Sequence, residues 1–288
     1  MPDFDCVYVS ATWGIHDERW TQALRDLGHR PRIVVLGRDA EPGTLAEVVG
    51  ALAGPGIPVL AGPLTTITRT LVEQLPKARI IGLSWGFDLH ELLRAGDVHW
   101  LDRAHGLVID SVATRDIAVS AGVDPAAIAF IPWGIDLGLF TPEGPTIERT
   151  AVGIDPEARL VLSLRAHEAL YRVGDIIDGF AEVAAGEPDL LLVVGHSGTL
   201  TASLQARASA LGIADRVRFI GTIEEAALAP WLRSAAVYVS ASEVDGTSVT
   251  LLQAMACRTP VVVSDTPGNL GWVEDGVTGA TFATGSVA

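Results

Sequence analysis

The sequence predicts an α/β protein built from two doubly wound parallel sheets. Short runs rich in β-branched residues alternate with amphipathic stretches along the whole chain, which is typical of parallel strands covered by helices. At 288 residues the chain is long for one core and comfortable for two domains. Segment 131–145 is rich in proline and glycine and has no periodicity, so it is a predicted linker. We therefore expect domains at residues 1–140 and 141–288.

The first half contains strand patterns separated by helical ones. The clearest helix has Asp17 near its start and Gly28 as its terminator, with apolar side chains at 20, 23, 24 and 27 on one face. The expected strands are residues 6–10, 32–36, 59–61, 79–83, 106–109 and 127–131.

The second half repeats this organisation. Its expected strands are residues 160–164, 190–194, 217–220, 237–239 and 261–263. Ligands of such folds bind beyond the carboxyl ends of the strands, so two facing domains would place a cleft between two sets of loops.

Composition limits the function classes. The formal charge of −15 is spread over both halves, so nucleic acid is an unexpected partner. No apolar stretch approaches the ~20 residues of a membrane span, and acids stand where a signal peptide carries Lys or Arg. Cys6 and Cys257 are scattered in apolar runs, so we expect buried thiols and a reducing compartment. These features favour a cytoplasmic protein.

The most informative segment is 242–263, which reads as an acidic loop, a glycine, a helix and a buried strand. The amides of residues 246–249 and the positive end of the helix dipole meet there and favour an anion. The carboxylate of Asp245 stands at the same place. A ligand with phosphate at one end and hydroxyls at the other, such as a nucleotide sugar, fits both features. The alternative is that Asp245 only caps the helix.

A cation is expected beside this segment. Arg165 follows an apolar strand at the end where ligands bind, and its guanidinium can pair with two phosphate oxygens. The histidines show no ligand spacing, and the Asp3-x-Asp5 pair precedes the first strand, so no metal site is expected.

Taken together, these residues resemble the family 4 glycosyltransferases, which have two Rossmann-like domains facing across a cleft in the GT-B arrangement. The donor-binding domain of that family resembles the second half. The segments that carry the resemblance are 84–88, 131–136, 163–165, 171–173, 193–195, 219–221, 245–263 and 264–269.

The resemblance implies roles for the acidic block. That family has two acids separated by seven residues, and Asp245 and Gln253 hold these positions, with Glu243 as the rival for the first. Asp245 would hold hydroxyls of the transferred sugar, and Gln253 would meet the ribose. Gln253 departs from the usual Glu, and we expect this change to lower donor affinity by a few-fold to about thirtyfold. The amides of Gly246, Thr247 and Ser248 would hold the leaving phosphate.

Further donor contacts follow from the same resemblance. Arg165 would hold the diphosphate. The family usually has a second cation, a Lys, shortly after this arginine, and Tyr171 and Arg172 lie near that position. The base is commonly contacted through backbone near Gly221. Gly14 lies in the first strand-to-helix turn, where the family places a glycine loop, although a plain turn is the alternative. Trp85 replaces a histidine that many relatives place near the reacting sugar.

These features predict a transferase that moves a hexose-like unit from a nucleotide diphosphate sugar to an acceptor hydroxyl. The resemblance implies that the reaction retains the anomeric configuration and is independent of a metal. We expect no cofactor, an acceptor that is a glycan, a lipid-linked molecule or a small molecule, and a role in cell-surface polysaccharide or glycoconjugate synthesis. Relatives continue beyond residue 288 through further helices, so we expect a shortened C-terminal domain. The alternatives are a non-catalytic nucleotide-sugar-binding protein or transferase subunit, and a sugar-nucleotide epimerase.

Overall fold

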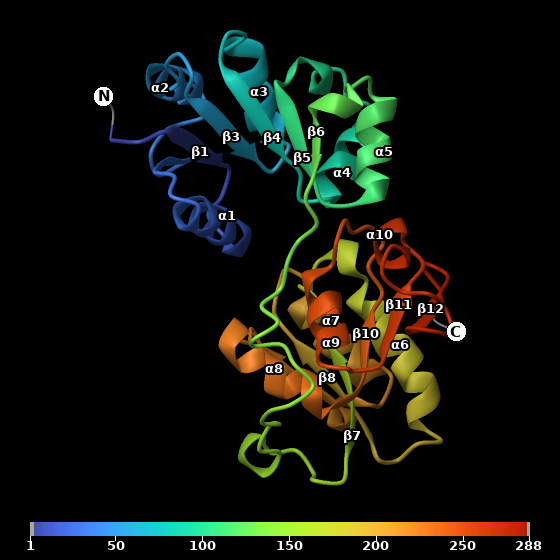
Figure 1. The fold of residues 1–288 in the computed structure, drawn as a ribbon. Helices are drawn as coiled ribbons and strands as arrows, with labels where there is room; N and C mark the ends of the chain where they lie inside the picture. Colours follow the sequence, from blue (N-terminus) through green and yellow to red (C-terminus); the bar gives the residue numbers. More distant parts are fainter. Residues whose placement is uncertain (1–2, 287–288) are drawn as a thin grey trace. The chain divides into compact units, whose positions relative to one another are not determined.

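The computed structural model describes residues 3–286 (Figure 1). The chain divides into two compact units, Met1–Pro132 and Trp133–Ala288. The division falls within the predicted linker, and residues 133–145 belong to the second unit. Phe140 is buried in that unit's core, and Arg233 donates hydrogen bonds to the carbonyl oxygens of Leu139, Thr141 and Pro145. This segment is therefore held by the second unit and is not a free tether.

The N-terminal unit is a six-stranded parallel sheet in the order β2-β1-β3-β4-β5-β6. The strands are β1 Cys6–Ser10, β2 Pro31–Val35, β3 Pro58–Gly62, β4 Arg79–Leu83, β5 Gly106–Ile109 and β6 Ile128–Phe130. The helices are α1 Ile15–Asp26, α2 Leu45–Leu52, α3 Thr66–Gln74, α4 Phe87–Ala95 and α5 Val112–Ser120. Each expected strand of this half is confirmed within one residue at each end.

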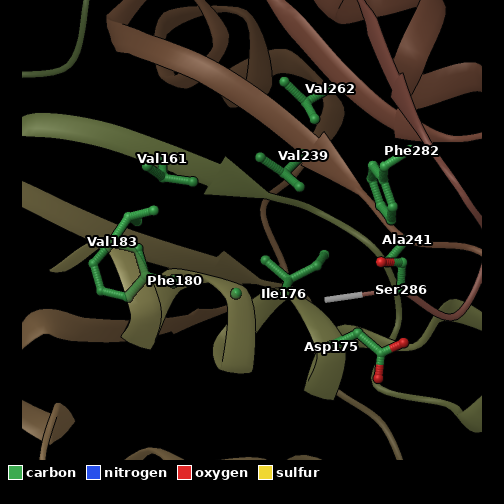
Figure 2. Close-up of a pocket in the computed structure, with 11 residues that line it drawn as sticks. Val161, Asp175, Ile176, Phe180, Val183, Val239, Ala241, Val262, Phe282 and Ser286 are labelled. Carbon is green, nitrogen blue, oxygen red and sulfur yellow. The ribbon is translucent and has the colours of Figure 1, made fainter. Parts of the chain in front are cut away.

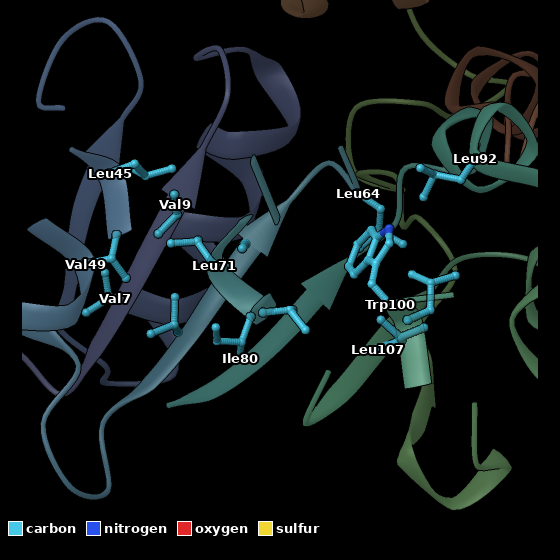
Figure 3. Packing of buried hydrophobic residues seen from close by; sticks show 14 of the residues in the cluster. Val7, Val9, Leu45, Val49, Leu64, Leu71, Ile80, Leu92, Trp100 and Leu107 are labelled. Atoms are coloured by element: carbon cyan, nitrogen blue, oxygen red, sulfur yellow. The ribbon is translucent and has the colours of Figure 1, made fainter. Parts of the chain in front are cut away.

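The core of this unit lies between the sheet and its helices. Figure 3 shows Val7, Val9 and Ile80 from the strands beside Leu45, Val49 and Leu71 from α2 and α3. Trp100 is 1% exposed and packs near Leu64 and Leu107. Because parallel strands are covered on both faces, their sequences are nearly continuous apolar runs, which explains why they were predictable.

Helix α1 follows the expected amphipathic pattern only in part. Its buried residues are Asp17 and Thr21, whereas Leu27 is 77% exposed and Ala23 is also exposed. The Tyr8 hydroxyl donates to Asp17 Oδ1 at 3.0 Å, which draws the polar side of the helix toward the sheet. Trp20 and Leu24 lie on the same face and pack against the cluster that contains Cys6 and Tyr8, so the predicted face is confirmed in part and a buried hydrogen bond adds Asp17 to it.

The C-terminal unit is a second six-stranded parallel sheet in the order β12-β11-β10-β7-β8-β9. The strands are β7 Arg159–Ser163, β8 Leu190–Gly195, β9 Val217–Gly221, β10 Ala235–Ser240, β11 Val261–Ser264 and β12 Ala280–Phe282. The helices are α6 Val173–Ala184, α7 Thr201–Ala210, α8 Glu225–Ser234, α9 Val249–Ala256 and α10 Pro267–Leu270. Helix α6 contacts β8 and β10, and α9 contacts β10 and β11.

The sequence misses strand β12. Its three residues, Ala-Thr-Phe, are too few to show an apolar run or a clear period. The other strands of this unit are confirmed, and both cysteines are buried. Within residues 3–286, every helix is too short or too polar to span a membrane.

Asp88 fastens two loops at the carboxyl ends of β3 and β4. Its buried carboxylate accepts hydrogen bonds from Leu64 N at 2.8 Å and from Ser84 Oγ at 2.7 Å. The amides of Trp85 and Leu89 also donate to it. Leu64 begins the connection to α3 and Trp85 the connection to α4, so one side chain fixes both.

We predict that Asp88→Ala lowers the unfolding free energy of the N-terminal unit by about 3 kcal/mol or more. The substitution leaves buried N–H and O–H donors without an acceptor, and each such donor costs about 1–3 kcal/mol. The measurement is urea denaturation followed by tryptophan fluorescence. Asp116→Ala, at an exposed position of α5, is the control. Equal stability of the two variants would contradict this role.

Candidate functional site

Connections after β7, β10 and β11 meet at the carboxyl edge of the second sheet. The amide of Glu243 donates to the carbonyl oxygen of Leu170 at 2.8 Å, which joins the first two connections. Ser264 Oγ donates to the carbonyl oxygen of Ser242 at 2.6 Å, which joins the second and third. Asn269 Nδ2 donates to the carbonyl oxygen of Ser264 at 2.9 Å. Backbone and short side chains thus hold the loop that precedes α9.

Gly268 permits the closest approach in this cluster. A methyl group built at Gly268 would overlap the carbonyl oxygens of Asp245 and Gly246. Its φ is not in the left-handed region, so the requirement is space and not backbone conformation. The site loop and the start of α10 therefore touch through backbone atoms. This glycine lies in one of the segments that carry the family resemblance, but no local signal in the sequence indicates its role.

Arg165 reaches the start of α9. Its guanidinium donates to Ser248 Oγ at 2.9 Å and to Asp245 Oδ2 at 2.7 Å, and it lies 4.2 Å from the centroid of the Tyr171 ring. The Arg165 and Asp245 side chains are 11% and 13% exposed. Burial is the largest single influence and lowers the pKa of Arg165, but the interactions with Asp245, Tyr171 and Tyr238 together outweigh it, so the pKa is raised above its ordinary value.

The start of α9 has the features of an anion site. Ser248 is the N-cap residue, and its Oγ accepts a hydrogen bond from Leu251 N at 3.4 Å. The first-turn amides of a helix have no acceptor within the helix. Gly246, Thr247 and Ser248 are buried directly before them. The structure therefore brings the predicted residues 165, 171, 245, 246, 247 and 248 into one cluster.

Asp245 and Glu243 occupy different places. Asp245 lies inside the cluster and pairs with Arg165. The Glu243 side chain is 41% exposed, and its carboxylate lies 3.9 Å from the Arg172 guanidinium. Arg172 Nε donates to Asp175 Oδ2 at 2.6 Å. Arg172 has a φ of 47° at the N-cap of α6, and it stands at the rim of the cluster. The geometry therefore favours Asp245 for the first acidic position.

Gln253 lies one turn into α9 and is only 3% exposed. Its Nε2 lies 3.4 Å from Oε1 of Glu225, the first residue of α8. Glu225 was not among the predicted site residues. Gly221, at the end of β9, has a φ of 70° and accepts a hydrogen bond from the amide of His196. The connections after β8 and β9 thus meet through backbone at the predicted base position.

Gly14 belongs to the other unit. It is the N-cap residue of α1, and its amide donates to Asp17 Oδ2 at 2.8 Å. His16, in the first turn of α1, packs against Trp85 with ring centroids 5.1 Å apart. An imidazole thus lies beside the tryptophan that replaces the family histidine.

A separate apolar pocket of about 360 Å³ lies between α6 and the strands (Figure 2). Aliphatic and aromatic side chains form most of its wall, including Val239, Val262 and Phe282. Among the described residues that line it, the charged group is Asp175. A pocket with a carboxylate and no lining cation is unsuited to a diphosphate. Across residues 3–286, no group of three or more His, Cys, Asp and Glu side chains is placed to hold a metal.

Comparison with known proteins gives a family match and several sequence relatives. Residues 146–288 match the family model "Glycosyl transferases group 1". D-inositol 3-phosphate glycosyltransferase 2 of Catenulispora acidiphila is 30% identical over 223 residues, which are 74% of this chain and 52% of that protein. The D-inositol 3-phosphate glycosyltransferase of Geodermatophilus obscurus is 33% identical over 174 residues, 57% of this chain and 39% of that protein. The chain thus spans about half or less of these relatives.

Solved structures share the fold. Anabaena HepE in complex with UDP and glucose aligns with a TM-score of 0.76 at 15% identity, over 99% of this chain and 87% of that chain. Sucrose-phosphate synthase from Thermosynechococcus elongatus aligns with a TM-score of 0.80 at 16% identity, over 98% of this chain and 86% of that chain. The predicted fold class, with two parallel α/β units, is confirmed.

We predict that Gly268→Ala loosens the loop before α9. The added methyl group pushes against two carbonyl oxygens, so amide hydrogen exchange at residues 243–249 becomes faster and the melting temperature falls. Gly271→Ala is the matched control, because a methyl group there would meet its nearest atom at 3.5 Å, an ordinary contact. Unchanged exchange in Gly268→Ala would show that the close approach does not hold the loop.

Proposed function

We propose, from the membership of this chain in the group 1 glycosyltransferase family, that it transfers a sugar from a nucleotide diphosphate sugar to an acceptor hydroxyl with retention of configuration. The observation that carries this proposal is the contact of Arg165 with Asp245 and Ser248 at the start of α9. This contact combines a cation, a carboxylate and a helix N-terminus, which suit the opposite chemical ends of such a donor.

Arg165 and the first-turn amides of α9 would hold the diphosphate. When the bond between the anomeric carbon and the diphosphate oxygen breaks, negative charge grows on the leaving group. Preorganised donors around that oxygen stabilise this charge and lower the barrier. The acceptor oxygen forms the new bond to the anomeric carbon, and its proton passes to the departing diphosphate oxygen. This electrostatic stabilisation supports a metal-independent reaction as part of the proposal.

Asp245 would change partner when the donor binds. Its carboxylate accepts from the guanidinium that the phosphates would use. Phosphate oxygens compete for the same N–H donors. The displaced carboxylate then becomes free to accept hydrogen bonds from hydroxyls of the transferred sugar. Between turnovers, when no donor is bound, the Arg165–Asp245 ion pair keeps the guanidinium charged and oriented.

The comparisons indicate which substrates to test first. HepE was solved with UDP and glucose, and the curated relatives are named for D-inositol 3-phosphate. We propose a UDP-sugar as the first donor and an inositol phosphate as the first acceptor, with glycan and lipid-linked acceptors as alternatives. A cytoplasmic role in cell-surface glycoconjugate synthesis remains part of the proposal.

A second function is favoured by one observation. Gln253 places a neutral amide where the family has a second acid, so the chain could bind a nucleotide sugar without transferring it. Such a protein would act as a binding partner of a transferase. Release of nucleoside diphosphate on addition of an acceptor supports the enzyme, whereas donor binding without turnover for every acceptor supports the partner.

We predict that Arg165→Ala weakens binding of the preferred nucleoside diphosphate by about 10- to 100-fold. Loss of charge-assisted hydrogen bonds accounts for this range. The ligand is identified by thermal shift with UDP, GDP, ADP and TDP and their sugars, because ligands that bind only the folded state raise its stability. Titration calorimetry then gives the affinity. Arg218→Ala, an exposed arginine on β9 of the same unit, is the control. Equal losses in both variants would contradict the role of Arg165.

We also predict a selective effect of Asp245→Asn. The neutral amide competes less strongly for Arg165, so the free nucleoside diphosphate binds at least as tightly as it does to the unmodified chain. The preference for the sugar nucleotide over the free diphosphate falls, because the carboxylate that would hold the sugar hydroxyls is gone. Calorimetry with the two ligands measures the ratio. An unchanged ratio would show that Asp245 acts only as a cap.

A further inference from the structure

The contact between Glu225 and Gln253 joins two elements of the donor unit. Gln253 comes from α9 and is buried, while Glu225 begins α8 and is partly exposed. The Gln253 amide nitrogen lies 3.4 Å from Glu225 Oε1 and is the donor of the pair. A buried amide thus faces a carboxylate that reaches the surface.

Charge explains why the two residue types occur together. A Glu at position 253 would place two carboxylates against each other, and like charges in such proximity destabilise the ionised state. A Gln at this position instead donates to Glu225. Glu225 stands in the first turn of α8, where a negative side chain interacts favourably with the helix dipole. In this chain the carboxylate of the contact is therefore on α8 and the amide is on α9.

Position along α9 indicates what this carboxylate meets. Gln253 lies four residues after Val249, so the two positions are about one turn, or roughly 6 Å, apart along the helix. The diphosphate would lie at the helix start and the transferred sugar on Asp245. The part of the donor joined to the other end of the diphosphate is the ribose. A carboxylate only accepts hydrogen bonds, which suits ribose hydroxyls and repels phosphate.

We propose that Glu225 accepts hydrogen bonds from the ribose hydroxyls of the donor and that Gln253 orients it. This proposal rests on the proposed function, because it assigns a part of the same nucleotide. Glu225 thereby replaces the acid that the family resemblance places at position 253. It follows that Glu225 compensates for the missing acid at position 253, so Gln253 does not indicate that nucleotide binding has been lost.

The test is calorimetry of the full chain with UDP, GDP or ADP, whichever stabilises it most. Glu225→Gln is expected to weaken binding by about 3- to 30-fold, because a neutral acceptor replaces a charged one. Gln253→Glu is also expected to weaken binding, since it creates two facing carboxylates. The exchange variant Glu225→Gln/Gln253→Glu restores affinity to within about threefold, because one carboxylate and one amide face each other again.

The ribose itself is tested with the 2′,3′-dideoxy form of the same nucleotide. With this probe, Glu225→Gln binds within about twofold of the unmodified chain, because the hydroxyls that Glu225 would contact are absent. Glu224→Gln makes the same charge change one residue away, at the exposed N-cap position of α8, and leaves both affinities unchanged. Thermal melting of each variant without ligand checks that it is folded.

Distinct outcomes separate this proposal from the function on which it rests. If the unmodified chain binds UDP, GDP or ADP and Glu225→Gln binds equally well, the ribose role of Glu225 is overturned and the proposed function stands. An equal loss with the ribose and dideoxy probes also overturns it. If the unmodified chain binds none of these nucleotides, the proposed function fails and this inference fails with it.

Discussion

The ion pair between Arg165 and Asp245 is the interaction on which the site depends. Each side chain is largely buried, and a buried charge is tolerated only when it is paired and hydrogen-bonded. Removing one partner would leave the other without compensation. The pair also holds the guanidinium at Ser248, directly before the amides that begin α9. A phosphate that takes the place of Asp245 therefore meets a cation and a helix N-terminus already in position.

The fold was predictable because its elements are local and repetitive. Parallel strands covered on both faces give apolar runs, and Arg165 follows one such run at the edge where ligands bind. The helix start after Asp245 is marked by a glycine and hydroxyl residues. These short-range signals are sufficient to predict an anion site at the start of α9. The length of most strands also followed from the sequence, because turns and glycines bound each run.

The remaining features depend on contacts between distant parts of the chain. Glu225 on α8 contacts Gln253 on α9, and no local sequence pattern predicts that contact. Gly268 is required by the carbonyl oxygens of a different loop. Asp17 is a charged residue on the inward face of its own helix, where it accepts a hydrogen bond from the Tyr8 hydroxyl. Such tertiary contacts override local propensity, and the pairing of Arg165 with Asp245 belongs to the same class.

A structure of the chain with its preferred sugar nucleotide tests the central claim most directly. The account predicts phosphate oxygens at about 3 Å from the Arg165 guanidinium and from the first amides of α9, with the Asp245 carboxylate released toward the sugar. A nucleotide bound elsewhere, with the Arg165–Asp245 pair intact, would contradict it.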